Sequence, residues 1–442
     1  MNVSPPANRW FLALLAALAL VALFLVTRHR AAQAQRELAA ATANQASAAV
    51  GTGRDRAFRF TRLPHASGGA APADAAAMVR EKLAQFSDSR LELARALAAS
   101  KHVTLSPQAE AFFAAVKAGD WEAIERLYKE LVESRPEDGP EAEGWQLIKC
   151  AAKEAYGAAE AAHAWPPDRL LQYGEAVLGA LRPGMVYIGG TDPGRFIPTL
   201  LNETSGGERH VVLTQNALAD ASYLEYVRFQ YSDRLALLDG ADSQRSFGDY
   251  IKDAKARALH DEQFPEAPAQ LRPGEQVRVT EGRVQVSGQT AVMAINEKLL
   301  TALLDKNPGV GFALEESFSL PSTYTGAAPA GALLELRAGE AGRAVTPEQA
   351  AQSIEFWRTA QQDLATEPPD SEVRKAWAKM AVAQSNLLAR QGFAAEAEQG
   401  YGLARALAPT LPEAIHGLVA LWEKDGRGAE AASLRRTLPA GK

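Results

Sequence analysis

The sequence predicts an α/β protein: a mainly parallel sheet with covering helices, flanked in sequence by α-hairpins and preceded by one N-terminal transmembrane helix. Three observations lead to this fold class. Short apolar runs alternate with helical segments across residues 183–340, apolar residues recur every three or four positions on both sides of that segment, and residues 10–26 carry no charge. The first pattern is typical of parallel strands joined by crossover helices. With 442 residues, the chain is long enough for two or three structural units.

Composition and charge exclude several classes of protein. Hydrophobic residues make up 47% of the chain and charged residues 23%, a balance that argues against a mostly disordered protein. The net charge of -6 argues against nucleic-acid binding, which needs a basic surface. Cys150 is the only cysteine, so no disulfide forms within the chain. No histidine pair has metal-ligand spacing and no dinucleotide or P-loop motif occurs, so we expect no metal and no cofactor.

The N-terminal part is interpreted as a tail at 1–9, a membrane anchor at 10–27 and a tether at 28–76. Seventeen uncharged residues at 10–26 are at the short limit of a membrane-spanning helix. The alternative is a cleaved signal peptide, with an A-x-A site at 32–34; that site lies eight residues beyond the apolar run, so we favour the anchor. Arg28, Arg30 and Arg36 favour a cytoplasmic body by the positive-inside bias. A single anchor followed by a tether more often delivers its domain outward, so we expect a single-pass membrane protein with an extracytoplasmic body.

Residues 77–182 are predicted to be helical and to contain one clear α-hairpin. Phe112 and Val116 lie on one face of its first helix, Gly119 breaks the pattern, and Ile124 and Leu131 mark the face of the second helix. Two such helices cannot bury both apolar stripes alone, so they must pack on neighbouring elements.

The C-terminal segment, 345–442, is predicted to repeat this hairpin with a period of 34 residues. Gly392 and Gly426 are 34 residues apart, and the tripeptide Ala-Glu-Ala at 395–397 recurs at 429–431. Residues 386–409 resemble a tetratricopeptide repeat, and so, in part, does the upstream hairpin. The positions that match its packing pattern are Ser385, Gly392, Ala397, Tyr401, Ala404 and Pro409. The resemblance implies a module that binds a partner protein; the alternative is that these helices only cap the α/β domain.

In the α/β segment, 183–340, the elements are predicted in the following order. Strands are expected at 185–188, 210–214 and 234–238, with helices at 195–202 and 219–231 between and after the first two. Period-two alternation at 276–287 around Glu281-Gly282 predicts a β-hairpin. A helix is expected at 290–304, stopped by Asn307-Pro308-Gly309, and strands at 311–318 and 332–338 complete the domain.

The turn after the first strand is the best candidate for a ligand site. It contains Gly189, Gly190, Thr191, Asp192, Gly194 and Arg195, and the turn after the second strand adds Asn216 and Asp220. Ligands of open α/β sheets bind at the carboxyl ends of the strands, where glycines let backbone amides approach and arginine pairs with anions. The structural alternative has Asp192 as a helix cap, the glycines as turn residues and Arg195 as a surface charge.

Two adjacent acidic residues, Glu315 and Glu316, fall on a later strand and should point to opposite faces. A plain edge strand is the simpler interpretation. Alternatively, one of the two is buried or turns toward the crevice as an acid or base.

Three motifs of this segment resemble a second family. GGTDPGRF at 189–196, VVLTQNALADASYLEYVR at 211–228 and the late EESF strand are similar to the soluble tail of bacterial membrane proteins grouped with protein O-mannosyltransferases. The resemblance implies an extracytoplasmic accessory domain with a crevice for a polyol or a peptide. The turn of that family is more acidic than Thr191-Asp192-Pro193, and this chain has one apolar span where lipid-linked sugar transfer requires many, so glycosyl transfer is not implied.

The sequence therefore favours a membrane-anchored envelope protein that acts as a non-catalytic protein-binding or scaffolding module. The alternative is a small-ligand-binding or glycan-related enzyme that uses the turns at 189–196 and 214–220.

Overall fold

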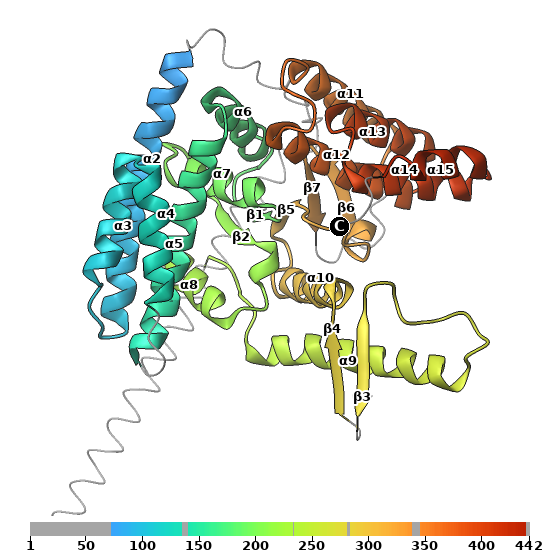
Figure 1. The fold of residues 1–442 in the computed structure, drawn as a ribbon, viewed down its shortest axis with the longest axis horizontal. Helices are drawn as coiled ribbons and strands as arrows, with labels where there is room; N and C mark the ends of the chain where they lie inside the picture. The colour runs from blue at the N-terminus through green and yellow to red at the C-terminus, as the bar shows by residue number, and fades with distance from the viewer. Residues whose placement is uncertain (1–71, 135–139, 233, 281–282, 338–344, 439–442) are drawn as a thin grey trace, which may run out of the picture. The chain divides into compact units, whose positions relative to one another are not determined.

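The computed structural model describes residues 72–134, 140–232, 234–280, 283–337 and 345–438 (Figure 1). The predicted anchor at 10–27 and nearly all of the tether lie outside the described residues. Among the helices that are described, none combines the length and the apolar character needed to cross a membrane.

In the described part of the chain, the helices that precede the sheet are α2 (Pro72–Ser100), α3 (Pro107–Ala118), α4 (Trp121–Glu133), α5 (Pro140–Ala164) and α6 (Pro167–Leu178). The predicted hairpin is formed by α3 and α4. Gly119 has a φ of 70°, a left-handed conformation that glycine adopts without strain, and the side chain of Asp120 caps α4. Both α2 and α5 contact helix α7 (Asp192–Glu203) and thereby connect this helical layer to the sheet.

The sheet has five strands in the order β2-β1-β5-β7-β6: β1 (Val186–Gly189), β2 (Val211–Thr214), β5 (Gly311–Glu315), β6 (Ala327–Ala330) and β7 (Leu333–Arg337). Strands β2, β1 and β5 are parallel, whereas β7 is antiparallel to both β5 and β6. The α/β class therefore holds, but the sheet is mixed, and the prediction of a mainly parallel sheet is wrong in this respect.

The strand predicted at 234–238 does not form. The backbone N–H and C=O of Ala236 are hydrogen-bonded to the side chain of Asn307, at 2.9 and 2.8 Å, so they are not available to a neighbouring strand. The third parallel strand is β5, more than 70 residues later. The prediction also missed β6, whose Pro329 is tolerated because β6 is the edge of the sheet.

Between β2 and β5 lie α8 (Ala221–Tyr231), α9 (Gly240–Gln263), the predicted hairpin β3 (Gln276–Thr280) and β4 (Arg283–Ser287), and α10 (Gln289–Lys306). The long helix α9 was not predicted, because its sequence is polar and lacks a regular apolar stripe. It is anchored instead through the ion pair between Arg257 and Glu275, just before β3.

The C-terminal helices are α11 (Pro347–Asp363), α12 (Glu372–Arg390), α13 (Ala394–Leu407), α14 (Pro412–Lys424) and α15 (Gly428–Arg435). Gly392 and Gly426 occupy the turns of the two hairpins with φ values of 92° and 77°. Ser385, Ala397, Tyr401 and Ala404 are buried between helices, whereas Pro409 is exposed in the turn before α14. Helix α12 lies against the sheet, because the amide of Gln384 donates hydrogen bonds to the carbonyl groups of Gly331 and Leu333.

Candidate functional site

Three turns begin at the same end of the sheet, where β1, β2 and β5 have their carboxyl ends. Gly189 at the end of β1 pairs in register with Thr214 at the end of β2 and with Glu315 at the end of β5. Because these strands are parallel, the segments that follow them emerge side by side. The first two are the turns that the sequence singled out, and the third begins with Glu316.

The glycine turn after β1 encloses the carboxylate of Glu315, which is only 1% exposed. The backbone N–H groups of Gly190 and Thr191 donate to it at 2.7 and 2.8 Å, and the Thr191 hydroxyl donates at 2.7 Å. A side chain at Gly194 would overlap the same carboxylate. The backbone amides that were expected to bind a ligand are therefore occupied by an acidic group of the chain itself. β5 is a central strand, so the simpler interpretation of Glu315 and Glu316 as part of an edge strand is wrong.

Glu315 and the start of α7 stabilise one another. Burial raises the pKa of Glu315, and the hydrogen bonds from Thr191 and Gly190 oppose that shift. The oxygen of Thr191 also accepts from Gly194 N at 3.0 Å, so Thr191 is the N-cap of α7, a role that the structural alternative assigned to Asp192. Helix α7 consequently begins at Asp192, three residues before the predicted start.

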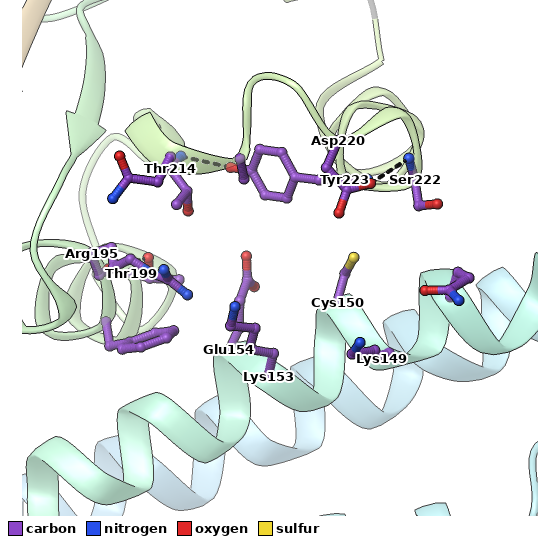
Figure 2. Close-up of a pocket in the computed structure, with 14 residues that line it drawn as sticks. Lys149, Cys150, Lys153, Glu154, Arg195, Thr199, Thr214, Asp220, Ser222 and Tyr223 are labelled. Carbon is purple, nitrogen blue, oxygen red and sulfur yellow. Dashed lines mark hydrogen bonds between the residues drawn. The ribbon is translucent and has the colours of Figure 1, made fainter. Parts of the chain in front are cut away.

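An open pocket of about 240 Å³ lies between α5, α7 and the β2–α8 segment. In Figure 2, Cys150 and Glu154 project from α5 toward Thr214, Tyr223 and Asp220 on the opposite side. Of the predicted site residues, Arg195, Asn216 and Asp220 line this pocket. Gly189, Gly190, Thr191 and Gly194 are not part of the lining and belong to the turn around Glu315. The Asp192 side chain is 74% exposed and is not part of the lining.

Both carboxylates of the pocket are already bound by other groups. Glu154 forms an ion pair with the buried Arg90 at 2.7 Å and accepts a hydrogen bond from the Tyr226 hydroxyl at 2.7 Å. Asp220 caps α8 by accepting from the backbone N–H groups of Ser222 and Tyr223. Within the described residues, neither carboxylate forms an ion pair with the cations that line the same pocket.

The cations of the pocket are Lys149, Lys153 and Arg195. Among the described residues, neither lysine has an acidic partner within 4 Å; Lys149 lies over the ring of Trp145. Burial and the nearby Arg195 lower the pKa of Lys153, the response expected of an amine held close to other positive charges.

Arg195 is the most enclosed of the three cations, with a side chain that is 13% exposed. Its guanidinium lies over the ring of Phe196 at 4.2 Å and is 3.7 Å from the carboxylate of Asp192. Its Nε atom is buried and has no hydrogen-bond partner in the described part of the chain. A buried donor without a partner costs free energy that an anionic ligand would recover.

The cysteine in the pocket is not an activated nucleophile. Burial, together with the negative charges of Glu154 and Asp220, raises the pKa of Cys150 to about 12. The group is consequently a thiol at neutral pH, and the thiolate is the reactive form. In the described ranges, no group of three or more His, Cys, Asp or Glu side chains could hold a metal ion. The three cations of the lining make the arrangement suited to binding an anion.

Sequence reasoning missed the contribution of α5. Lys149 and Lys153 are four residues apart and so share one face of a helix, which the sequence does show. What it does not show is that α5 packs against α7 and α8 and thereby brings this face to the sheet edge.

Comparisons with known proteins do not assign the chain to a class. No family model matches the sequence, and neither the curated proteins nor the solved structures contain a match.

Proposed function

We propose that the chain binds a small anionic molecule in the pocket between α5, α7 and the β2–α8 segment. The observation that carries this proposal is the charge of the lining, which contains Lys149, Lys153 and Arg195. The two carboxylates of the lining bind other groups: Glu154 pairs with Arg90, and Asp220 caps α8. Multi-oxygen anions such as carboxylates and phosphates are the ligands that Arg and Lys recognise most strongly. Asn216 is a fourth contributor, since its side-chain oxygen accepts from Ser317 at 3.3 Å and its NH₂ group can donate.

Binding of a partner protein by the C-terminal helices has less support. The resemblance of residues 386–409 to a tetratricopeptide repeat motivates it, but helix α12 is bonded to the chain's own strands through Gln384. That contact reduces the surface of α12 that a partner protein could occupy. The function that we infer is therefore ligand binding, with the α-hairpins supporting the fold.

Replacing Arg195 tests the anion site. We expect inorganic phosphate or succinate to bind the full-length chain, and Arg195→Gln to weaken that binding at least tenfold, about 1.4 kcal/mol. Isothermal titration calorimetry at low salt measures the effect. The matched control is Asp192→Asn, which removes the exposed carboxylate beside Arg195 and should leave affinity unchanged or slightly higher. Equal affinities in the wild-type and Arg195→Gln proteins would contradict the proposal.

We further propose that residues 10–27 anchor the protein in a membrane and that its body is extracytoplasmic. The support is the uncharged run at 10–26 followed by a segment rich in Ala, Gly and Ser. A C-terminal fusion to a phosphatase that is active only outside the cytoplasm should be active in cells and should sediment with membranes. The same fusion without residues 1–30 is the control and should be inactive. An inactive full-length fusion would place the body in the cytoplasm.

A further inference from the structure

A second cavity, of about 360 Å³, also opens at the carboxyl ends of the parallel strands, on the other side of β5. It lies between the segment 316–319, which follows β5, and helices α10, α12 and α14. Ser317 separates it from the anion pocket, because its backbone N–H donates to Gln215 at 3.1 Å and its hydroxyl donates to Asn216 at 3.3 Å. The two cavities therefore adjoin but have different linings.

Glu316 is the most buried polar group of this second cavity, with 5% of its surface exposed. Its carboxyl group accepts from Leu320 N at 3.2 Å and from the Tyr324 hydroxyl at 2.9 Å. Within the described residues it forms no ion pair. Burial, followed by the negative charges of Glu315 and Glu297, raises its pKa to about 8. Glu316 thus keeps its proton at neutral pH unless a positive charge enters the cavity.

The rest of the lining combines apolar and charged groups. Met293, Phe318 and Val382 supply apolar surface. The other charged or titratable groups of the lining are Lys379 on α12 and Glu413 and His416 on α14. Outside the lining, Glu297 on α10 acts on Glu316, and burial together with the charge of Glu316 raises the pKa of Tyr401 on α13. The charge of Lys379 opposes the rise in the pKa of Glu315 that burial causes. It is not among the main influences on the pKa of Glu316. A buried acid and a cation thus occupy one cavity without being paired with each other.

We propose that this cavity binds an α-amino acid with an aliphatic side chain, with Glu316 receiving the ammonium group and Lys379 the carboxylate. An ammonium group beside Glu316 would favour the ionised carboxylate and compensate for its burial. The apolar residues of the lining would cover the aliphatic side chain and remove it from water, which favours binding. The site is independent of the anion pocket, because it shares no lining residue with it.

Three probes of one shape separate the contributions of the two ligand charges. We expect L-leucine to bind, isopentylamine, which lacks the carboxylate, to bind more weakly, and 4-methylpentanoate, which lacks the amine, to bind at least tenfold more weakly than leucine. Calorimetry of the full-length chain at pH 7, in two buffers with different ionisation enthalpies, should show release of close to one proton from the protein for each leucine bound. Binding of 4-methylpentanoate as tightly as leucine, or no binding of either amine, would overturn the proposal.

Glu316→Gln should abolish proton release and weaken leucine binding at least tenfold, with thermal melting showing that the variant folds. Above pH 8 we expect this variant to be at least as stable as wild type, because the wild-type carboxylate is then ionised in a buried position.

Lys379→Met provides a second variant that should weaken the binding of leucine but not that of isopentylamine. The probe series is run in the Arg195→Gln background as well, which removes binding of the probes' carboxylates at the anion pocket, so a failure here would leave the anion proposal intact. Unchanged leucine binding in Glu316→Gln would rule out the assigned role of Glu316.

Discussion

Replacing Glu315 with alanine is expected to lower the free energy of unfolding by about 3–5 kcal/mol. The substitution removes the acceptor of three buried donors, the N–H groups of Gly190 and Thr191 and the Thr191 hydroxyl. Each buried donor left without a partner costs about 1–3 kcal/mol. Urea unfolding at neutral pH, followed by circular dichroism, measures the change.

The effect of Glu315→Ala should extend to the anion pocket. Thr191 caps α7, and Arg195 lies in the first turn of that helix. A less ordered Gly190–Thr191 segment should therefore also leave Arg195, the most enclosed cation of the pocket, less well positioned. We therefore expect weaker phosphate binding in Glu315→Ala than in wild type. Glu355→Ala serves as the control: this carboxylate lies on the exposed face of α11, pairs with Arg358, and should cost no more than about 1 kcal/mol. A loss below 1 kcal/mol in Glu315→Ala as well would show that the Gly190–Thr191 turn does not depend on the carboxylate.

Replacing Arg90 with leucine is expected to cost about 3–5 kcal/mol as well. Arg90 is only 2% exposed, lies over the ring of Phe86 at 4.5 Å, and contacts Glu154 at 2.7 Å and Glu203 at 3.6 Å. Its removal leaves the carboxylates of Glu154 and Glu203 with less positive charge nearby to balance their negative charge. Because Glu154 lines the pocket, its charge would then oppose that of Lys153 and Arg195, so anion affinity should also fall.

The double variant Arg90→Leu/Glu154→Leu separates the two effects. Removing the pair together avoids the uncompensated charge, so the double variant should be more stable than Arg90→Leu alone and should recover anion affinity. The exposed pair Arg126–Glu130 provides a matched comparison, and Arg126→Leu should change stability by less than about 1 kcal/mol. If the double variant is as unstable as the single one, the contacts with Glu203 and Phe86 dominate instead.

Local elements with strong signals were predictable from the sequence. The helices at 107–118 and 121–133, the strands at 186–189 and 211–214 and the hairpin around 281–282 depend on periodicity and turn residues within a few positions of one another. The segment 234–238 shows the limit of this reasoning. Its apolar pattern is that of a strand, but its backbone is bonded to Asn307, about 70 residues away, and no local signal reports that contact.

The candidate site was predictable in the same partial way. Placement of Arg195, Asn216 and Asp220 near one sheet edge follows from β1 and β2 being adjacent parallel strands. The function of the glycines does not follow from the sequence, because a glycine-rich turn looks the same whether its amides bind a ligand or an internal acid. Glu315 is more than 120 residues from that turn, and only its contact distances reveal which applies.

By itself, the sequence determined the α/β class of this protein, the turns at Gly119, Gly392 and Gly426, and the candidate turns that follow β1 and β2, because each depends on residues close together in the chain. Tertiary structure alone decided that the sheet is mixed, that the glycine turn encloses Glu315, and that α5 places Lys149 and Lys153 beside Arg195. The physical reason is that burial and charge compensation depend on which distant segments meet, and those contacts determine whether a polar side chain remains available to a ligand.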